Sequence, residues 1–340
     1  TAYSVMAWIH PNSGQAEVLH NREGEEQTRS VVYYGKDVTR VGTLAEAKLK
    51  DPAEAERVVR SDKRDIKNKT VRMIDGNPIT PSEVAVEVFS KLKRDAEKGA
   101  FNNKPVNRAV VAVPASFDPR EEQAIKDAAT KAGFTEVEIL WEPVAAAIAY
   151  LKAGQEVGQR ILVFDLGAGT FDVAVLDRSE DNIKPFQVIQ EPRGQPCGGD
   201  DFDWLLMTHV LEQLSDEGSR DSGFRRRLLL LCRDLKETLS FDKDDKLTVD
   251  LPDGTTHCQE ISRKKFEELI QPRLEEMLEQ CDQLAKCVQE DGGKIDTLVL
   301  IGGSSRIPLV SRRLHEILQL EPRSWHKQDV AVALGAAHYG

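Results

Sequence analysis

Two apolar runs joined by a glycine turn constrain the fold of this 340-residue chain more than any other feature. The segment ILVFDLGAGTFDVAVLD, residues 161–177, carries one aspartate where the first run ends and a second where the next run begins. Runs of this length predict two buried strands with a tight turn between them. One interpretation is a plain hairpin, in which Asp165 and Asp172 are turn formers and the glycines supply positive φ angles.

The same turn has the chemistry of a phosphate site. Asp165 follows a four-residue buried run, where a charge without a partner is costly. Gly167 and Gly169 flank one small residue, so backbone N–H groups can approach a ligand closely, and Thr170 adds a hydroxyl. Such donors suit phosphate oxygens, and a carboxylate suits hydrated Mg²⁺. The pattern alone leaves the hairpin and the phosphate site open.

Composition limits the class of protein. The chain is 40% apolar and 30% charged, with a formal net charge of −11, and its length suits two lobes. No apolar run approaches the roughly 18 residues of a membrane span, and the N-terminal residues do not resemble a signal peptide. An acidic surface argues against nucleic acid as a partner. Five cysteines without a CxxC pair favour free thiols, and we expect a cytoplasmic monomer with no membrane partner.

Strands alternate with helices through the first half of the chain, which predicts an α/β architecture. Thr80 and Asp118, each followed by proline, open two helices, and Pro143 opens a third. The second half is mainly helical, with one short β segment, KLTVDLPDG. Pro272 lies inside the longest expected helix, about residues 263–289, and should kink or split it.

Two further glycine turns follow. LVLIGGSSRIP, residues 298–308, fits a strand-to-helix turn capped by Ser304 or Ser305. It also fits a nucleotide edge that packs on bare backbone, with Arg306 stacked flat on a base. PCGGDDFD, residues 196–203, taken alone is an acidic helix start after a glycine turn.

Taken in order, these turns carry a resemblance to a known family. DLGAGTFDVAVLD resembles the second phosphate motif of the heat-shock protein 70 chaperones, in the actin-like ATPase superfamily. LVLIGGSSRIPLV resembles the family's adenosine motif, and PCGGDDFDWLL its glycine-rich segment. VVAVPASFDPREEQAIKDAATKAGF and WEPVAAAIAY resemble its connecting segment, and DVAVALGAA its closing helix. The matches run in family order over nearly the whole chain.

The resemblance implies a two-lobed α/β fold of the actin-like ATPase type, built from RNase H-like repeats. Lobe I would comprise residues 1–157 and 326–340, with a reduced outer subdomain. Lobe II would comprise residues 158–325, with a mainly helical outer subdomain at about 200–290. ATP or ADP with Mg²⁺ would bind in the cleft between the lobes.

The resemblance also implies catalytic roles. Asp165 would organise water around Mg²⁺, and Glu142 would be a second carboxylate near the metal. Thr170 would hold phosphate, and Asp172 would sit close to the attacking water. Lys63 matches the family's catalytic lysine by position, although a solvated surface lysine is the alternative. Hydrolysis of ATP would act as a slow timer that changes the angle between the lobes.

The remaining contacts implied by the resemblance surround the nucleotide. The phosphates would be held by Thr1, Ala2, Tyr3, Gly167, Ala168, Gly169, Gly198 and Gly199. The adenosine would be held by Arg233, Lys236, Glu237, Ser240, Gly302, Gly303, Ser304, Arg306 and Asp329.

Several positions depart from the family. Ala2 stands in place of a threonine, and Ala168 in place of a glycine, which requires a negative φ. Arg233 replaces a ribose-contacting glutamate, Glu237 replaces an arginine that stacks on the base, and Glu122 replaces an arginine that relays the nucleotide state. These departures support a second hypothesis, a nucleotide-gated interaction module with little or no hydrolysis. A sugar kinase on the same fold is less favoured.

The resemblance implies partners as well. A peptide-binding domain or partner protein outside this chain would read the nucleotide state, and a J-domain-type co-chaperone is a candidate partner. The segment between Lys63 and Thr80 is shorter than in relatives, which disfavours the usual exchange factors. The aspartate and glycine expected before Thr1 are absent, and the strand VMAWI lacks a partner strand, so we expect the sequence to be trimmed there.

Overall fold

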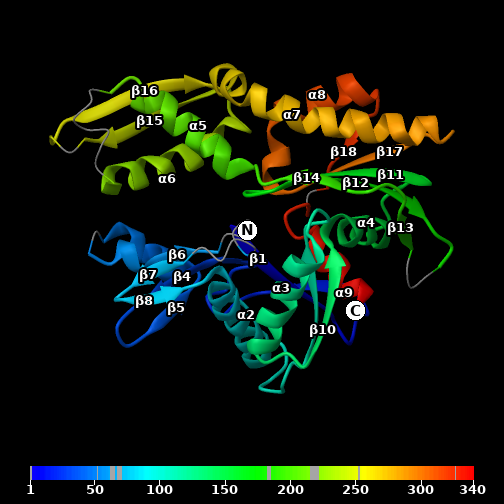
Figure 1. The fold of residues 1–340 in the computed structure, drawn as a ribbon, viewed down its shortest axis with the longest axis horizontal. Coiled ribbons are helices and arrows are strands. Elements are labelled where there is room, and N and C mark those ends of the chain that lie inside the picture. The colour runs from blue at the N-terminus through cyan, green and yellow to red at the C-terminus, as the bar shows by residue number, and fades with distance from the viewer. Residues whose placement is uncertain are drawn as a thin grey trace.

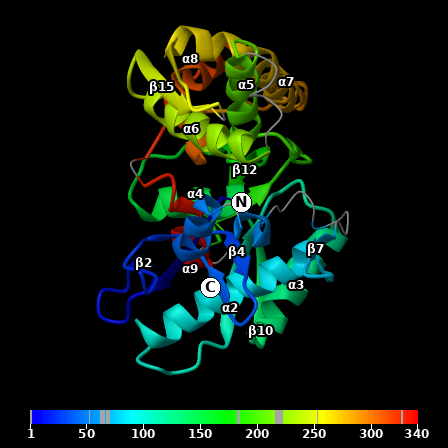
Figure 2. The same cartoon turned by 90° about the vertical axis from the view of Figure 1, so that its left-hand side faces the viewer.

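The computed structural model describes residues 2–51, 53–61, 66, 71–181, 185–214, 222–251, 253–325 and 327–340. Two predicted site residues, Thr1 and Lys63, lie outside these ranges. The described chain mixes helices with several sheets, as the α/β prediction requires. Figure 1 shows two groups of elements, one above the other, and Figure 2 shows the same division from the side.

The lower group in Figure 1 contains the N-terminal strands and the chain's two ends. Its strands form an antiparallel sheet β2-β1-β3, a second sheet β5-β4-β6, a hairpin β7-β8 and a parallel pair β9-β10. These strands are β1 (Tyr3–Ile9), β2 (Ala16–Leu19), β3 (Gln27–Arg29), β4 (Val31–Tyr34), β5 (Thr39–Val41), β6 (Val58–Arg60), β7 (Arg72–Ile74), β8 (Asn77–Ile79), β9 (Arg108–Val113) and β10 (Glu136–Trp141). Its helical elements are α1 (Thr43–Glu46), η1 (Ala47–Lys50), η2 (Ala55–Arg57), α2 (Pro81–Lys98) and α3 (Pro119–Lys131).

The upper group is built on one sheet in the order β13-β12-β11-β17-β18, with β14 paired to β12. Strand β11 lies between an antiparallel neighbour, β12, and a parallel one, β17. The strands are β11 (Arg160–Leu166), β12 (Phe171–Arg178), β13 (Phe186–Val188), β14 (Arg193–Gln195), β15 (Asp244–Asp250), β16 (Thr256–Ser262), β17 (Thr297–Ile301) and β18 (Pro322–Arg323). The helical elements are α5 (Gly199–Leu211), α6 (Ser222–Leu239), α7 (Arg263–Glu290), η5 (Gly303–Arg306) and α8 (Pro308–Leu318).

Two small-residue helices, α4 (Glu142–Lys152) and α9 (Ala331–Tyr339), pack between the groups (Figure 1). Helix α4 shares a buried cluster with β11 and β12, and α9 contacts β1, β2 and β9. The two helices cross closely, because a Cβ on Gly335 would lie 1.7 Å from the carbonyl oxygen of Ala145. The alanines and glycine of these segments therefore allow the two helices to form small buried clusters where the groups adjoin.

Local sequence signals set the helix starts. Thr80 caps α2 in a capping box with Glu83, whose side chain accepts a bond from the Thr80 N–H at 2.7 Å. Asp118 caps α3 in the same way, together with Glu121. The hairpin prediction for residues 161–177 is also confirmed, because β11 pairs with β12 in a register that places Asp165 opposite Asp172.

One local prediction is wrong in part, and one strand was missed. Helix α7 is continuous over Arg263–Glu290, so Pro272 does not split it. Buried side chains on both sides of the proline, including Phe266, Ile270 and Leu274, hold the helix against the core and offset the lost hydrogen bond. The β segment after α6 is a hairpin of β15 and β16, because residues 256–262 form a second strand that the sequence did not indicate.

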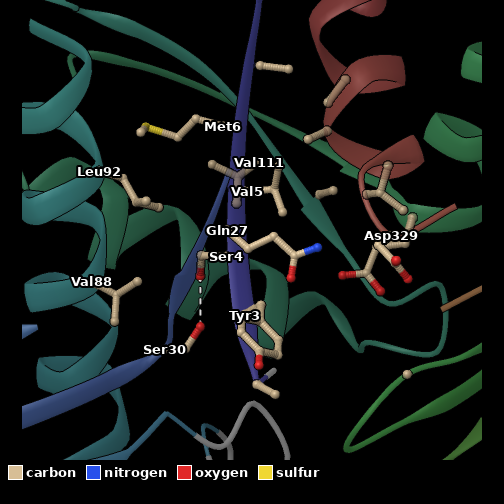
Figure 3. Close-up of a pocket in the computed structure, with 18 of the residues that line it drawn as sticks. Tyr3, Ser4, Val5, Met6, Gln27, Ser30, Val88, Leu92, Val111 and Asp329 are labelled. Atoms are coloured by element: carbon tan, nitrogen blue, oxygen red, sulfur yellow. Dashed lines mark hydrogen bonds between the residues drawn. The ribbon is translucent and has the colours of Figure 1, made fainter. Parts of the chain in front are cut away.

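The lower group has a gap that the upper group lacks. Among the described residues, β1 pairs with β2 and β3 but not with β9, and β9 pairs only with β10. Val5, Met6 and Val111, from β1 and β9, line a shared pocket together with Leu92 of α2 (Figure 3). In the upper group, by contrast, β11 pairs with both β12 and β17, whereas no strand of the described residues pairs with both β1 and β9.

Candidate functional site

Three glycine turns that are far apart in sequence meet at the end of the upper sheet. The turn after β11 is closed by a bond from the Gly167 N–H to the Thr170 carbonyl, at 3.0 Å. The N-terminus of α5 packs on this turn, because Asp200 N–H donates to the Ala168 carbonyl at 2.7 Å and Gly199 N–H to the Gly167 carbonyl at 3.0 Å. The third turn, at Gly302, follows β17, which lies beside β11.

Close packing at this junction requires bare backbone. Gly302 has a φ of 79°, and a Cβ there would lie 2.4 Å from the Leu166 carbonyl oxygen and 2.7 Å from Asp165 Oδ1. A Cβ on Gly198 would lie 2.7 Å from the Ala168 carbonyl oxygen, and a Cβ on Gly199 would lie 2.3 Å from Ser304 Oγ in η5. Glycine at these positions therefore allows the three turns to touch.

The turn itself is less restrictive than its glycines indicated. The hairpin interpretation expected Gly167 to supply a positive φ, and this is wrong, because its φ is not positive. Ala168 is not among the positive-φ residues either, which meets the condition set for alanine at this position. The turn accordingly accepts alanine without strain.

A pocket of about 1070 Å³ lies beside the junction and continues into the apolar gap between β1 and β9. Most of the predicted site residues line it. They are Ala2, Tyr3, Glu142, Asp165, Gly167, Ala168, Gly169, Thr170, Arg233, Lys236, Glu237, Ser240, Gly302, Gly303, Ser304, Arg306 and Asp329.

Of the predicted residues that the structure describes, three do not line the pocket. Gly198 and Gly199 pack behind the turn, as described above, and begin α5 with a capping bond from the Gly198 N–H to Asp201 at 2.8 Å. The acidic helix start expected for PCGGDDFD is therefore present. Asp172 is 1% exposed and accepts a bond from the Ser116 N–H at 3.1 Å. This bond joins β12 of the upper group to the loop that follows β9 in the lower group.

Two carboxylates line the pocket from different elements. Asp165 is the penultimate residue of β11, is 7% exposed and lies in register with Ile301 of β17. Glu142 is the first residue of α4. Among the described residues, no group of three His, Cys, Asp or Glu side chains could ligate one metal ion directly. The carboxylates present suit a cation that keeps most of its water shell, as Mg²⁺ does.

A network of charges forms the wall of the pocket at α6. Arg233 donates to Asp200 at 2.8 Å and to Asp203 at 3.2 Å. Lys236 contacts Asp203 at 2.7 Å and the Gly199 carbonyl at 2.9 Å. Burial raises the pKa of Asp203, although the charges of Lys236 and Arg233 oppose this shift. Sequence reasoning missed Asp200, an acid in the first turn of α5, and Asp203, which lies further along the same helix.

Two more pairs hold predicted residues in place. Arg306 and Asp329, assigned separately to the adenosine, bind each other at 2.5 Å. Tyr3 lies under the guanidinium of Arg29, 4.9 Å from the ring centre, and Arg29 in turn pairs with Glu46 at 2.7 Å. Burial raises the pKa of Tyr3. Arg29 was not predicted, because nothing in the local sequence links β3 to the first residues of β1.

Comparison with known proteins identifies the family. The model of the Hsp70 protein family matches residues 57–340. This chain belongs to the Hsp70 family. It is 34% identical over 352 residues to the chaperone protein DnaK of Thermosipho africanus and 35% identical over 358 residues to that of Thermotoga neapolitana.

These matches cover 99% of this chain and 57% of each relative, so the chain spans little more than half the length of the relatives it matches. The matched part corresponds to the nucleotide-binding domain of the family. Hsp70 proteins are chaperones whose ATPase domain binds ATP and ADP with Mg²⁺. In the part of this chain that the structure describes, no helix is long and apolar enough to cross a membrane.

Proposed function

We propose that this chain binds ATP and ADP with Mg²⁺ in the pocket beside the three glycine turns and hydrolyses ATP slowly. The observation that carries the proposal is the junction itself. Three turns from distant parts of the sequence meet beside one pocket, and Asp165 of β11 and Glu142 of α4 line it. Backbone donors beside carboxylates fit a phosphate chain with its cation.

The phosphates would lie against residues 167–170, with Ala2 and Tyr3 opposite. The backbone N–H groups and the Thr170 hydroxyl would bind phosphate oxygens, and Asp165 and Glu142 would hold water around Mg²⁺. When bound, Mg²⁺ supplies charge neutralisation on the phosphates. Asp172, through its place behind the turn, would help orient the attacking water, and Lys63 keeps its assignment as a prediction outside the described residues.

The adenosine would lie between η5 and α6. Gly302, Gly303 and Ser304 offer bare backbone and a hydroxyl on one side, and Lys236 and Ser240 line the other. Arg306 is already oriented by Asp329, so its guanidinium can face a base without losing freedom on binding.

We also propose that the two groups act as lobes I and II, with the boundaries given by the sequence. The α4–α9 crossing is where their relative angle would change with the nucleotide. A peptide-binding domain or partner protein outside this chain would read that angle, and a J-domain-type co-chaperone would stimulate hydrolysis. We also propose a cytoplasmic site of action, in keeping with the free thiols expected from the cysteine pattern.

The second candidate is a module that binds nucleotide but barely hydrolyses it. One observation favours it. Arg233 stands where a ribose-contacting glutamate was expected, and a guanidinium has only donors, so it cannot accept a bond from a ribose hydroxyl as a carboxylate does. Its donors are already used by Asp200 and Asp203. Glu237 is exposed and cannot stack on a base as an arginine does.

Single-turnover hydrolysis of Mg-ATP separates the two candidates. We expect a slow rate above background that Asp165→Asn lowers by about tenfold or more, as loss of a carboxylate near a metal does. Asp234→Asn, at an exposed position on α6, is the matched control and should keep the rate. A background rate that Asp165→Asn leaves unchanged, together with ADP binding in calorimetry, favours the binding module. No binding of either nucleotide refutes both candidates.

A further inference from the structure

The segment that leads into α3 contacts both groups near the proposed site. On one side, the backbone N–H of Ser116 donates to Asp172. On the other side, the indole Nε1–H of Trp141 donates to Glu122 Oε1 at 2.9 Å. Glu122 lies in the first turn of α3, where the helix dipole favours a carboxylate. One short segment thus contacts Asp172 directly and, through Trp141, the residue that precedes Glu142.

Trp141 lies where β10 passes into α4. It is the last residue of β10 and the N-cap of α4, and its side chain makes no capping bond to that helix. Its ring packs into the small cluster that contains Val113 and Ile125, while its N–H reaches Glu122. Packing and the hydrogen bond together fix the ring, and through it the backbone turn from β10 into α4.

The next residue after this turn is Glu142, which lines the pocket. The position of the Glu142 carboxylate depends on where the backbone places its Cα and on its own side-chain torsions. The backbone turn at Trp141 therefore sets where the Glu142 side chain begins. A shift at Trp141 therefore moves Glu142 relative to Asp165. Hydrogen bonds that orient a metal's ligands tune metal affinity, and the Glu122–Trp141 bond would act in the same way from one residue further out.

We propose that Glu122 is a positioning residue for this site, acting through Trp141 on Glu142. Its carboxylate does not touch the nucleotide. It fixes the indole and thereby the distance at which Glu142 meets the water shell of Mg²⁺. The proposal rests on the proposed function, because it assumes that Asp165 and Glu142 act on a hydrated Mg²⁺.

The test is the Mg²⁺ dependence of ADP binding, measured by calorimetry at a series of Mg²⁺ concentrations and also with a chelator. Glu122→Ala removes the acceptor, and Trp141→Phe removes the donor while keeping a ring in the cluster. We expect each to raise the half-saturating Mg²⁺ concentration by about tenfold. ADP binding in the chelator should stay within about twofold of wild type, because the Mg²⁺-independent contacts are untouched.

Two further variants separate positioning from general stability. Glu122→Gln keeps a carbonyl oxygen in place and should restore a Mg²⁺ dependence close to wild type. The double variant Glu122→Ala/Trp141→Phe should match the single variants, because both remove the same bond. Gln123→Ala, at an exposed position on the same turn of α3, is the matched control and should have no effect.

The outcomes divide cleanly. If wild type binds ADP in a Mg²⁺-dependent way and Glu122→Ala has the same half-saturating Mg²⁺ concentration, the positioning role is refuted and the proposed function stands. Equal effects of Glu122→Ala and Glu122→Gln also refute it, as does a loss of thermal stability without a change in Mg²⁺ dependence. If wild-type ADP binding is undetectable or independent of Mg²⁺, both the inference and the Mg-nucleotide function fail.

Discussion

Replacing Gly302 by alanine should damage both the fold and the pocket. Gly302 follows β17 and has a φ of 79° and a ψ of 144°, a combination nearly confined to glycine. An added Cβ would lie 2.4 Å from the Leu166 oxygen and 2.7 Å from Asp165 Oδ1. The first of these atoms is backbone at the end of β11, which is paired with strands on both sides, so it cannot move aside cheaply.

The chain contains a matched control for this change. Gly76, in the turn between β7 and β8, also has a φ of 79°, but nothing lies within 4 Å of its ideal Cβ. Gly76→Ala therefore measures the cost of a positive φ, about 1–2 kcal/mol. Gly302→Ala should cost about 1–3 kcal/mol more, because the overlap with Leu166 and Asp165 adds an overpacking penalty.

Urea unfolding of the two variants and of wild type gives these free energies of unfolding, and calorimetry with Mg-ADP gives binding. We expect Gly76→Ala to bind ADP like wild type. Gly302→Ala should bind at least tenfold more weakly, because the overlap displaces the Asp165 carboxylate. Equal unfolding free energies for the two variants, or unchanged ADP binding by Gly302→Ala, would refute the claim that this glycine is required by close contact.

Two other predictions follow from the gap beside β1 and from the burial of the thiols. A peptide that copies residues 160–167, RILVFDLG, should fill the gap between β1 and β9 and raise the midpoint of thermal unfolding of the protein. A version with proline in place of Val163 lacks one strand N–H and should not raise it. Equal shifts from both peptides would count against strand pairing. Burial raises the pKa of Cys197 to about 11, so iodoacetamide at pH 8 should label the exposed Cys258 first, as read by peptide mass spectrometry, and faster labelling of Cys197 would contradict this.

Features coded by neighbouring residues could be predicted from the sequence. The hairpin of β11 and β12 and the starts of α2, α3 and α4 depend on short patterns of apolar, capping and proline residues, and the structure has them where expected. The lining of the pocket was predicted through the family resemblance, since no local pattern links Tyr3 to Arg306.

Features that depend on distant packing were missed. The continuity of α7 through Pro272 is decided by the buried residues around it, which outweigh the local effect of proline. Asp200 and Asp203 look like ordinary acids near the start of a helix until α6 brings Arg233 against them. Strand β16 has few large apolar side chains and exists because it pairs with β15 along its whole length.

The glycine turn after β11 illustrates the same division within a single motif. From the sequence, its glycines are explained by close approach of a ligand or by a positive φ. The turn forms without a positive φ at either Gly167 or Ala168. The strict requirement lies on the partner turns, because a Cβ on Gly198 would meet the Ala168 oxygen and a Cβ on Gly302 would meet Asp165. Alanine at position 168 is therefore tolerated because the bare backbone is supplied from the other side. A glycine in a site motif can thus serve the packing of turns on one another, and the residues that face the ligand are then freer to vary than their partners.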